Sequence, residues 1–505
     1  MKVLLINPPW WVGKRQGVRA GSRWPHLKIP EEDRYMPYPF YLGYATSLLK
    51  KNNFEVKAID AIAEGLSNEK FKEKVYDYSP DFIVSETSTP TMDQDLELLK
   101  EIKNKKKCKI AIAGPDVNLF TEKFLKKNIF IDFVLIGEYD FTILDLLKSI
   151  KLKKDLSNVK GILFRKKNKI INNGRALLKQ NIDQLPWPDR EDFPIYNYHD
   201  CPGGIPEPSA QLWASRGCSY QCVFCLWPQV MYGGSNYRIR NVVDVVDEIE
   251  FLVKSKNFKS FYFDDDTFNI GKKRMLNFAK ELRSRNLNVP WAFMGRADLS
   301  DRETLVSFRI SGLYAVKYGV ESGVQELVDR AKKNLNLEKA IENIKITKEL
   351  GIKVHLTFTF GLPGETKETI MKTINLALKL DPDSVQFSIM TPFPGTKLYE
   401  DMKALGNIES FYSKKIDGNT KSVIRKKSLS PDDLKRAQDY AYKKWDEHKF
   451  KKQRYKQLSP IKLFKICFKE HGLKFTIKKI IRYITNGNFL YYFGISKVNR
   501  TTSKN

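Results

Sequence analysis

Short runs of β-branched and aromatic residues alternate with longer amphipathic stretches in two separate parts of this 505-residue chain. This alternation is typical of βα units on a parallel sheet. In the first part we expect strands at 2–7, 54–60, 81–85, 109–114 and 132–137, with helices at 41–51, 68–76, 93–103 and 142–151. Residues 1–151 are therefore predicted to form a Rossmann-like, doubly wound α/β domain. In such domains a ligand lies beyond the carboxyl ends of the strands.

A second βα series begins at residue 211. We expect its strands at 212–215, 260–263, 291–295, 315–320, 354–360 and 384–390. Six repeats predict a partial, TIM-like (β/α)6 barrel over residues 211–400, with the chemistry on the loops at the carboxyl ends of its strands. Residues 152–210, which contain a hairpin pattern and several prolines, are interpreted as a connector. Residues 401–505 lose the βα rhythm and are predicted to be mainly helical and basic.

The composition is that of a globular protein, with 42% hydrophobic and 29% charged residues. The sequence contains no apolar run of the roughly 18 to 20 residues that a membrane span needs, and no signal peptide pattern, so we expect a cytoplasmic protein. Residues 441–505 carry 17 Lys and Arg against three acids, a net charge of +14 out of +28 for the chain. Within this tail, residues 473–484 resemble a basic amphipathic helix. Peripheral contact with the inner face of a membrane, contact with RNA, and packing on the barrel are the alternatives for it.

Three of the six cysteines fall within eight positions, as Cys218, Cys222 and Cys225, directly after the first strand of the second series. Three thiolates from one loop can hold three irons of a cubane cluster and leave the fourth iron open to another ligand. A structural zinc knuckle built on these three cysteines would need a fourth protein ligand, which no paired cysteine or histidine motif supplies. The other cysteines are scattered and are expected to be ordinary packing or surface thiols: Cys108, Cys201 and Cys467.

The Cys-x3-Cys-x2-Cys spacing, with the aromatic Phe224 before its last cysteine, resembles that of radical S-adenosylmethionine (SAM) enzymes. Further segments resemble the strand-end motifs of this family: 263–268, which is acidic here instead of the commoner Gly-Gly-Glu, 318–323, 360–366 and 391–396. The resemblance implies that the three cysteines bind a [4Fe-4S] cluster. It also implies that SAM contacts Phe224, Asp264, Asp265, Asp266, Arg296, Glu321, Ser322, Gly361, Pro363 and Glu365.

Structural roles are the alternatives for some of these residues. Each of Asp264, Asp265 and Asp266 could cap a helix, and Arg296 could be an internal ion-pair partner instead of a cofactor contact.

The family resemblance also implies a reaction. In the family the reduced cluster cleaves SAM to methionine and a 5′-deoxyadenosyl radical, which removes hydrogen from an unactivated carbon. The resemblance implies a reducing electron donor, such as flavodoxin or ferredoxin, and a small-molecule or lipid substrate. Nucleic acid is not the expected partner.

The first domain resembles the cobalamin-binding domain that precedes the barrel in one subclass of these enzymes, through 5–9, 113–115 and 137–138. The resemblance implies that cobalamin contacts Asn7, Pro8, Asp60, Gly65, Ser85, Gly114 and Gly137. Many cobalamin domains coordinate cobalt through the histidine of an Asp-x-His-x-x-Gly motif. Here Ile62 occupies that position, and isoleucine cannot bind a metal. The domain therefore binds cobalamin without a histidine ligand, or it has lost cobalamin.

Another possible part of the site is the long loop 19–25. It combines Arg19, Arg23 and Trp24, and it either closes over a cofactor or acidic substrate or is an ordinary solvated loop.

These features together predict a cobalamin-dependent radical SAM enzyme that methylates an unactivated carbon. One alternative is a ring-forming or ring-contracting enzyme like the anaerobic magnesium-protoporphyrin monomethyl ester cyclase, and another is a radical SAM enzyme that has lost cobalamin. A non-enzymatic alternative is a cobalamin sensor or scaffold. Methylthiotransferases acting on transfer RNA usually need three more cysteines in the N-terminal domain, where Cys108 is the only cysteine before residue 200.

Overall fold

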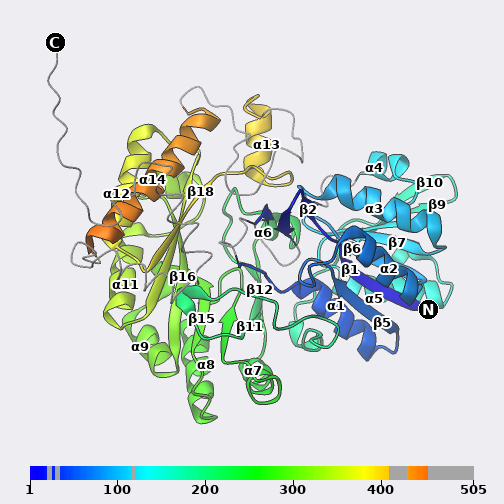
Figure 1. The fold of residues 1–505 in the computed structure, drawn as a ribbon, viewed down its shortest axis with the longest axis horizontal. Helices are drawn as coiled ribbons and strands as arrows, with labels where there is room; N and C mark the ends of the chain where they lie inside the picture. Colours follow the sequence, from blue (N-terminus) through cyan, green and yellow to red (C-terminus); the bar gives the residue numbers. More distant parts are fainter. Residues whose placement is uncertain (20–24, 29–33, 117–120, 409–428, 453–505) are drawn as a thin grey trace. The chain divides into compact units, whose positions relative to one another are not determined.

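The computed structural model describes the chain except for residues 20–24, 29–33, 117–120, 409–428 and 453–505 (Figure 1). Residues Met1–Lys435 form one compact unit. This unit contains two large sheets, and both are α/β structures as the sequence predicts. Cys467 and the predicted helix at 473–484 lie outside the described residues.

The first sheet has seven strands in the order β10-β9-β8-β7-β6-β1-β5. Five of them are parallel and match the predicted strands: β1 (Lys2–Asn7), β5 (Glu55–Asp60), β6 (Phe82–Glu86), β7 (Lys109–Ala113) and β8 (Phe133–Leu135). The helices between them are α1 (Phe40–Lys51), α2 (Asn68–Tyr78), α3 (Met92–Lys105), α4 (Glu122–Lys127) and α5 (Asp140–Lys151). The strand order reverses at β1, because β5 lies on one side of it and β6, β7 and β8 follow on the other. In a doubly wound fold this reversal places the ligand-binding crevice at the carboxyl ends of β1 and β6.

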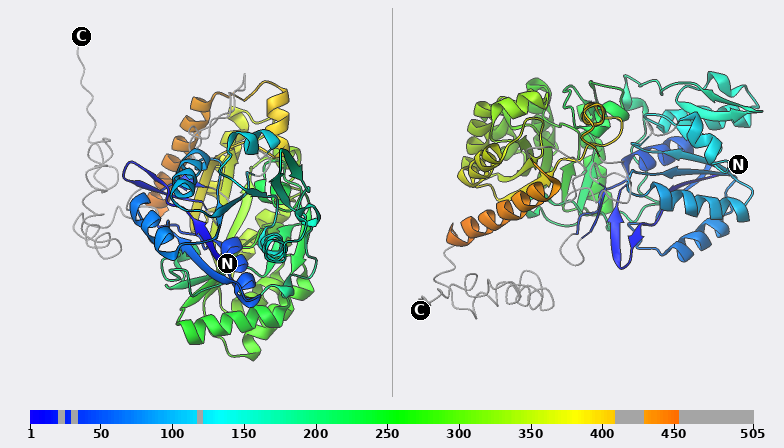
Figure 2. Two further views of the ribbon diagram at one scale, coloured as in Figure 1. Left: turned by 90° about the vertical axis from the view of Figure 1, so that its right-hand side faces the viewer. Right: turned by 90° about the horizontal axis from the view of Figure 1, so that it is seen from above.

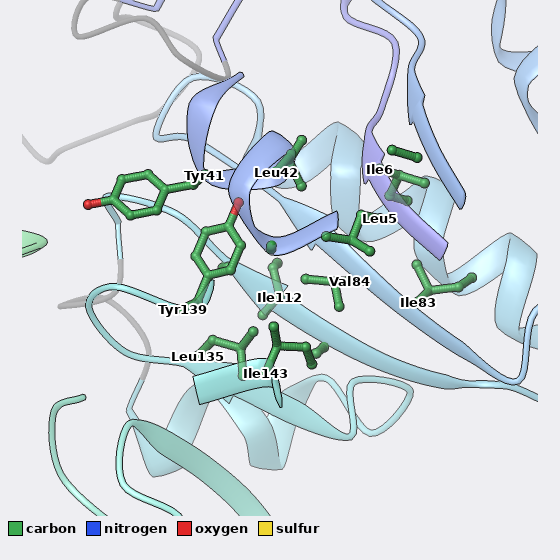
Figure 3. Close-up of a cluster of buried hydrophobic side chains, with 14 of the residues drawn as sticks. Leu5, Ile6, Tyr41, Leu42, Ile83, Val84, Ile112, Leu135, Tyr139 and Ile143 are labelled. Atoms are coloured by element: carbon green, nitrogen blue, oxygen red, sulfur yellow. The ribbon is translucent and has the colours of Figure 1, made fainter. Parts of the chain in front are cut away.

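Hydrophobic residues on both sides of this sheet form its core. Right-handed crossovers place α1 on one face and α2 to α4 on the other. Figure 3 shows Leu5 and Val84 from the strands beside Leu42 of α1 and Ile143 of α5. All four side chains are buried, and every residue of β6 is buried, so both faces of the sheet are covered beneath the loops at its carboxyl edge.

The hairpin predicted near residues 161–171 is present, as β9 (Ile162–Lys166) and β10 (Lys169–Asn172). It continues the first sheet, because β9 pairs antiparallel with β8. Beyond the hairpin, up to residue 208, the chain contains only short 3-10 turns, η3 (Ile182–Gln184) and η4 (Pro202–Gly204); another, η2 (Leu156–Asn158), precedes the hairpin.

The second sheet is an open arc of six parallel strands in sequence order, as predicted for a partial barrel. The strands are β11 (Ser209–Leu212), β14 (Ser260–Phe263), β15 (Trp291–Gly295), β16 (Leu313–Glu321), β17 (Lys353–Phe360) and β18 (Ser384–Ile389). The intervening helices are α7 (Val242–Lys256), α8 (Lys272–Ser284), α9 (Arg302–Ile310), α10 (Gln325–Arg330), α11 (Leu337–Glu349) and α12 (Lys367–Leu380), with the turn η5 (Ala297–Leu299). In Figure 1, α8, α9, α11 and α12 lie along the outside of the arc.

The predicted position of the first barrel strand, 212–215, was wrong. The strand ends at Leu212, and a separate hairpin of β12 (Ser215–Cys218) and β13 (Asn236–Ile239) follows. The apolar run extends past the strand because Trp213 is buried against the aromatic rings of Phe40 and Trp227 instead of continuing the sheet.

The remaining elements are short or lie near the carboxyl end. They are the three-stranded sheet of β2 (Trp11–Val12), β3 (Arg15–Val18) and β4 (His26–Leu27), and the helices α6 (Leu226–Val230), α13 (Lys397–Ala404) and α14 (Pro431–Lys452). Figure 2 shows α14 as one continuous helix. Among the described residues, no helix is both long and apolar enough to cross a bilayer.

Candidate functional site

Cys218, Cys222 and Cys225 lie on one loop, which begins at the end of β12 and ends where α6 starts at Leu226. All three are thiols rather than disulfide partners. Burial raises the pKa of Cys218 and of Cys222 above that of an ordinary cysteine. Three thiols from one loop are the donor set that holds three irons of a cubane cluster, so the residues present fit this group.

Gln229 fixes the shape of this loop, and the sequence analysis missed it. Its side-chain amide donates to the carbonyl oxygens of Cys222 at 3.1 Å, Val223 at 3.2 Å and Cys225 at 2.8 Å. Its carbonyl oxygen accepts from the backbone of Lys397 at 2.7 Å. A glutamine on a short helix belongs to no recognisable motif, and only the folded loop shows its role.

Two of the three predicted aspartates after β14 hold the chain that leads into the cysteine loop. Asp265 accepts hydrogen bonds from the Ala214 amide at 3.1 Å and from the Ser215 hydroxyl. Asp266 accepts from the Gly217 amide at 3.1 Å and from the hydroxyl of Tyr232 at 3.0 Å. Asp265 and Asp266 therefore have structural roles, which the sequence analysis gave as the alternative. They position the chain around β12 and do not cap a helix.

The third aspartate, Asp264, is buried, and its carboxylate lies 3.4 Å from the Tyr262 hydroxyl. Contact of any of the three aspartates with SAM remains a prediction.

Arg296, after β15, is an internal ion-pair partner, the alternative raised by the sequence. Its guanidinium pairs with Asp298 at 2.8 Å and donates to the carbonyl oxygens of Lys333 and Asn334 at 2.7 Å each. The guanidinium also lies 3.6 Å from the ring centroid of Tyr220, which belongs to the cysteine loop. Arg296 therefore packs against this loop through Tyr220, and its contact with a cofactor remains a prediction.

Glu321, at the end of β16, forms a buried polar cluster with two residues that have no family motif. Its carboxylate accepts from the Lys333 ammonium at 3.0 Å and from the Thr359 hydroxyl at 2.7 Å. Burial alone would lower the pKa of Lys333, but the charges of Glu321 and Cys222 raise it, so the ammonium stays charged. Glu321 has a φ of 69°, a left-handed conformation that costs a non-glycine residue about 1–2 kcal/mol. Strain of this kind is concentrated at functional sites.

The other predicted SAM contacts shape the loops after β16 and β17. The hydroxyls of Ser322 and Thr373 lie 3.3 Å apart, which ties the β16 loop to α12, and Glu365 accepts from the Gly361 amide within its own loop. Pro363 lies between these two residues, and Phe224 packs beside the buried cluster of Val223, Leu327, Leu362 and Met390. Ser322, Gly361, Pro363 and Glu365 follow the carboxyl ends of β16 and β17, where the chemistry of such barrels takes place.

At the carboxyl edge of the first sheet, Asp60 organises the loop in which the motif histidine is absent. Its carboxylate accepts from the Asn7 amide at 2.7 Å, from the Tyr198 hydroxyl at 2.9 Å and from the backbone amides of Ile62 and Ala63. Burial raises the pKa of Asp60 to about 6. Asp60 therefore caps the backbone of this loop without the help of a histidine. This role accounts for an aspartate at position 60 in a loop that has Ile62 in place of the motif histidine.

Arg19 lies in the crevice between β1 and β6 and is buried there. It forms an ion pair with Asp95, and it donates to the Asn7 side chain at 3.0 Å, to the Thr91 hydroxyl at 2.8 Å and to the carbonyl oxygen of Pro8. This part of the predicted loop is therefore a fixed wall of the crevice and not a solvated segment. Residues 20–24, which include Arg23 and Trp24, lie outside the described residues.

The predicted glycines at this edge differ in what they require. A Cβ at Gly114, whose φ is +133°, would clash with the carbonyl oxygen of Thr87, so only glycine fits. Gly137 has a φ of +89° and closely approaches the backbone of Met231, whereas a Cβ at Gly65 would meet nothing within 4 Å. Ser85 is fully buried on β6.

Asp116 supplies an observation for the fit of a ligand at this edge. It is completely buried just after β7, and burial raises its pKa to about 7. One of its carboxylate oxygens accepts from the Thr89 hydroxyl, while the other has no hydrogen-bond partner among the described residues. An orphaned buried acceptor on a polar sheet edge fits a ligand that offers hydrogen-bond donors, as the amide side chains of cobalamin do.

Buried ion pairs join this edge directly to the hairpin that carries the first cluster cysteine. Arg216 of β12 lies 2.5 Å from Asp140, and Arg238 of β13 binds both carboxylate oxygens of Glu138 at 2.6 and 2.8 Å. Burial lowers the pKa of Arg216, but the attraction of Asp140 and Glu138 outweighs this and raises it above its ordinary value. Buried charges thus connect the loop after β8 directly to the hairpin that leads into the cysteine loop.

Comparison with known proteins agrees with this geometry. Residues 214–377 match the model of the radical SAM superfamily. The chain is 27% identical over 483 residues to an uncharacterized methyltransferase of Pyrococcus horikoshii, covering 95% of this chain and 97% of that protein. It is 26% identical over 430 residues to the anaerobic magnesium-protoporphyrin IX monomethyl ester cyclase of Cereibacter sphaeroides, covering 82% of this chain and 65% of the cyclase.

The structure of the cobalamin-dependent SAM radical enzyme OxsB, with aqua-cobalamin and SAM bound, is similar in fold. Its TM-score is 0.68 at 17% sequence identity, with 97% of this chain and 72% of that chain covered. The similarity includes the Rossmann-like sheet as well as the barrel. The chain is therefore a radical SAM enzyme, which uses SAM and a [4Fe-4S] cluster, and it has the fold of cobalamin-dependent radical SAM enzymes, in which a Rossmann-like domain precedes the barrel.

Proposed function

We propose that this enzyme uses cobalamin together with the radical SAM centre to methylate an unactivated carbon of a small-molecule substrate. The observation that carries the proposal is the buried link from Glu138 and Asp140 to Arg216 and Arg238. This link joins the carboxyl edge of the first sheet to the cysteine hairpin, so that groups held at the two places serve one reaction. The methyltransferase of Pyrococcus horikoshii, which matches nearly the whole chain, supports this reading.

When bound, SAM at the cluster would supply the radical that removes hydrogen from the substrate, and cobalamin would supply the methyl group. In this proposal Cys218, Cys222 and Cys225 hold the cluster by their thiolates. Glu321 and Lys333 orient the polar groups of SAM, with the carboxylate available to an ammonium or to ribose hydroxyls and the ammonium to a carboxylate. At the first sheet, Asn7, Pro8, Asp60, Gly65, Ser85, Gly114 and Gly137 form the cobalamin edge, without a histidine at position 62.

Aromatic side chains pack between the two sheets and would exclude water from the reaction. Trp213 contacts Tyr41 and Trp227, and Tyr41 also lies against Tyr139, with ring centroids 5.4 to 6.0 Å apart. All four rings are buried. Exclusion of water protects a carbon-centred radical from side reactions.

The first experiment measures both cofactors in one anaerobic preparation, reconstituted with iron, sulfide and hydroxocobalamin. We expect stoichiometric cobalamin in the visible spectrum and formation of 5′-deoxyadenosine under a strong reductant. The Cys222→Ala variant should lose deoxyadenosine formation and keep cobalamin, while Cys108→Ser, at a buried thiol of the first sheet, should behave as the wild type. Deoxyadenosine without bound cobalamin would contradict the cobalamin proposal, and cobalamin binding without deoxyadenosine would favour a sensor.

The cyclase relative supports a second candidate, radical ring formation or ring contraction. The two reactions differ in their use of SAM, because methylation consumes a second molecule to restore the methyl donor. With substrate present, equal amounts of S-adenosylhomocysteine and 5′-deoxyadenosine would favour methylation. Deoxyadenosine alone would favour the cyclase type.

The cellular setting is also part of the proposal. A cytoplasmic enzyme would take electrons from a flavodoxin or ferredoxin and act on a small molecule or a lipid. Peripheral membrane contact through the basic tail would favour the lipid, and this part of the tail lies outside the described residues. Binding of the full-length enzyme to anionic and to neutral vesicles tests it directly.

A further inference from the structure

A second group of metal-binding side chains lies far in sequence from the cluster motif, in the segment that enters the barrel. It consists of His199, Cys201 and Glu207, whose ligand atoms all lie within 4.8 Å of one another. The Nδ1 atom of His199 is 3.2 Å from a carboxylate oxygen of Glu207 and 3.7 Å from the Cys201 sulfur. With metal–ligand bonds of about 2.0–2.3 Å, a tetrahedral zinc ion places its ligand atoms roughly 3.2–3.8 Å apart.

The three side chains are held in place by groups that are not ligands. The backbone of His199 pairs in both directions with that of Met36, at 2.8 Å each. The Arg34 guanidinium binds both carboxylate oxygens of Glu207, at 2.7 and 3.2 Å. An outer hydrogen bond of this kind fixes the orientation of a ligating carboxylate.

The turn between the ligands is fitted to the barrel. The chain folds back through Gly203, whose φ is 63° and where a Cβ would come within 2.7 Å of the Ala315 side chain. The Gly204 amide then donates to the carbonyl oxygen of Cys201 at 3.0 Å. A folded turn between residues 201 and 207 brings the ligands together before any metal binds.

We propose that His199, Cys201 and Glu207 bind one Zn²⁺ ion, with a water molecule as the fourth ligand. A thiolate, an imidazole and a carboxylate are the three ligand types that zinc takes in proteins. Their charges of −1, 0 and −1 would balance the charge of +2 on the ion.

The geometry gives this site a structural role. Glu207 lies two residues before β11 begins, at the amino end of the barrel, whereas the cysteine loop follows the carboxyl end of the same strand. At the amino end of such barrels, fixed residues serve stability rather than chemistry. The site would fasten the segment of Arg34 and Met36 to the entrance of the barrel.

The test uses the full-length enzyme with its iron–sulfur cluster reconstituted, then equilibrated with zinc and freed of excess metal. Elemental analysis should give one zinc per chain. Zinc-edge X-ray absorption should show one sulfur at about 2.3 Å and nitrogen or oxygen ligands at about 2.0–2.2 Å. This readout is independent of catalysis and does not detect the cluster iron.

Variants assign the zinc to these residues. Cys201→Ser should lose the sulfur shell, His199→Asn should bind zinc at least tenfold more weakly, and Arg34→Gln should weaken binding by about 10-fold through the outer hydrogen bond. Cys108→Ser is the matched control and should keep both the stoichiometry and the sulfur. A variant with all three cluster cysteines replaced by alanine should still bind one zinc.

Two results would overturn the proposal. The first is a wild-type enzyme with a filled cluster that binds no zinc. The second is zinc that keeps its sulfur ligand in Cys201→Ser and disappears when the cluster cysteines are replaced, because zinc would then occupy only the cluster site. If Cys201→Ser does not fold, His199→Asn and Arg34→Gln decide between the same outcomes.

Discussion

Arg216, two residues before the first cluster cysteine, forms a buried ion pair with Asp140 at the start of α5 in the Rossmann-like sheet region. The two side chains are 3% and 1% exposed, so water hardly screens their attraction. The pair connects segments more than seventy residues apart and joins the two halves of the proposed active site.

Replacing Arg216 by Met should therefore damage both stability and cluster binding. Removing one partner of a buried pair leaves an uncompensated charge and costs about 3–5 kcal/mol. We expect a lower thermal unfolding midpoint and a lower iron content, with partial recovery when Asp140→Asn is added. The exposed pair of Arg302 and Glu349 is the control, since Arg302→Met should cost less than about 1 kcal/mol. Equal effects of the two arginine substitutions would show that the buried pair does not stabilise the assembly.

Glu321 should contribute to SAM binding through its carboxylate. A hydrogen bond to a charged group is worth about 1.5–3 kcal/mol, so Glu321→Gln should raise the KM for SAM by roughly 10- to 100-fold. Thr359→Val removes one neutral hydrogen-bond donor to Glu321 at nearly constant volume. It should raise the KM for SAM only about fivefold. Deoxyadenosine formation at several SAM concentrations measures both variants. A fall in kcat at unchanged KM would place Glu321 outside the SAM site.

Two glycines at the carboxyl edge of the first sheet should respond differently to alanine. Gly114→Ala introduces a clash with the Thr87 carbonyl oxygen, and we expect the thermal unfolding midpoint to fall by several degrees or the domain not to fold. At Gly65 an added Cβ would meet open space, and φ is +66°. Gly65→Ala should therefore lower the free energy of unfolding only by the cost of the left-handed conformation, about 1–2 kcal/mol. Calorimetry of the two variants side by side tests the difference. Similar midpoints would mean that the loop after β7 yields to the added methyl group.

The Asp116 carboxyl should make stability depend on pH. Its pKa is about 7 in the folded protein and near 4 in the unfolded chain, so the folded state holds the extra proton between these values. Stability contributed by this group is therefore complete below about pH 4 and is lost as the pH rises toward 7, by at most about 4 kcal/mol. Asp116→Asn should flatten the decline between pH 4 and 7. Unfolding midpoints across this range measure it, and parallel curves for the two proteins would exclude a buried neutral carboxyl.

The sequence predicts much of the fold because its strands stand out as short runs of β-branched and aromatic residues, buried throughout in β6 and at alternate positions in β17. The five parallel strands of the first sheet and the last five of the barrel follow from these runs. The first barrel strand was displaced because Trp213 extends the apolar run while its ring serves the packing between the two sheets.

The site could be predicted only where a motif carries the chemistry. The cysteine spacing marks the loop, but no motif marks Gln229 or Lys333. Their roles depend on long-range contacts, such as that of Lys333 with Glu321, that no local pattern encodes. For the aspartates after β14 the motif predicts more than the structure shows. Asp265 and Asp266 occupy motif positions, but their hydrogen bonds in the structure hold the backbone near β12.

The hairpin of β9 and β10 has a consequence for the behaviour of the protein in a crowded solution. Because it extends the first sheet, the outermost strand on that side is a short one that carries the exposed Lys169. On the other side the outermost strand, β5, presents the exposed charges of Glu55 and Lys57. Charged, short border strands are poor templates for a second chain, so the sheet is protected from strand-by-strand aggregation at both of its borders.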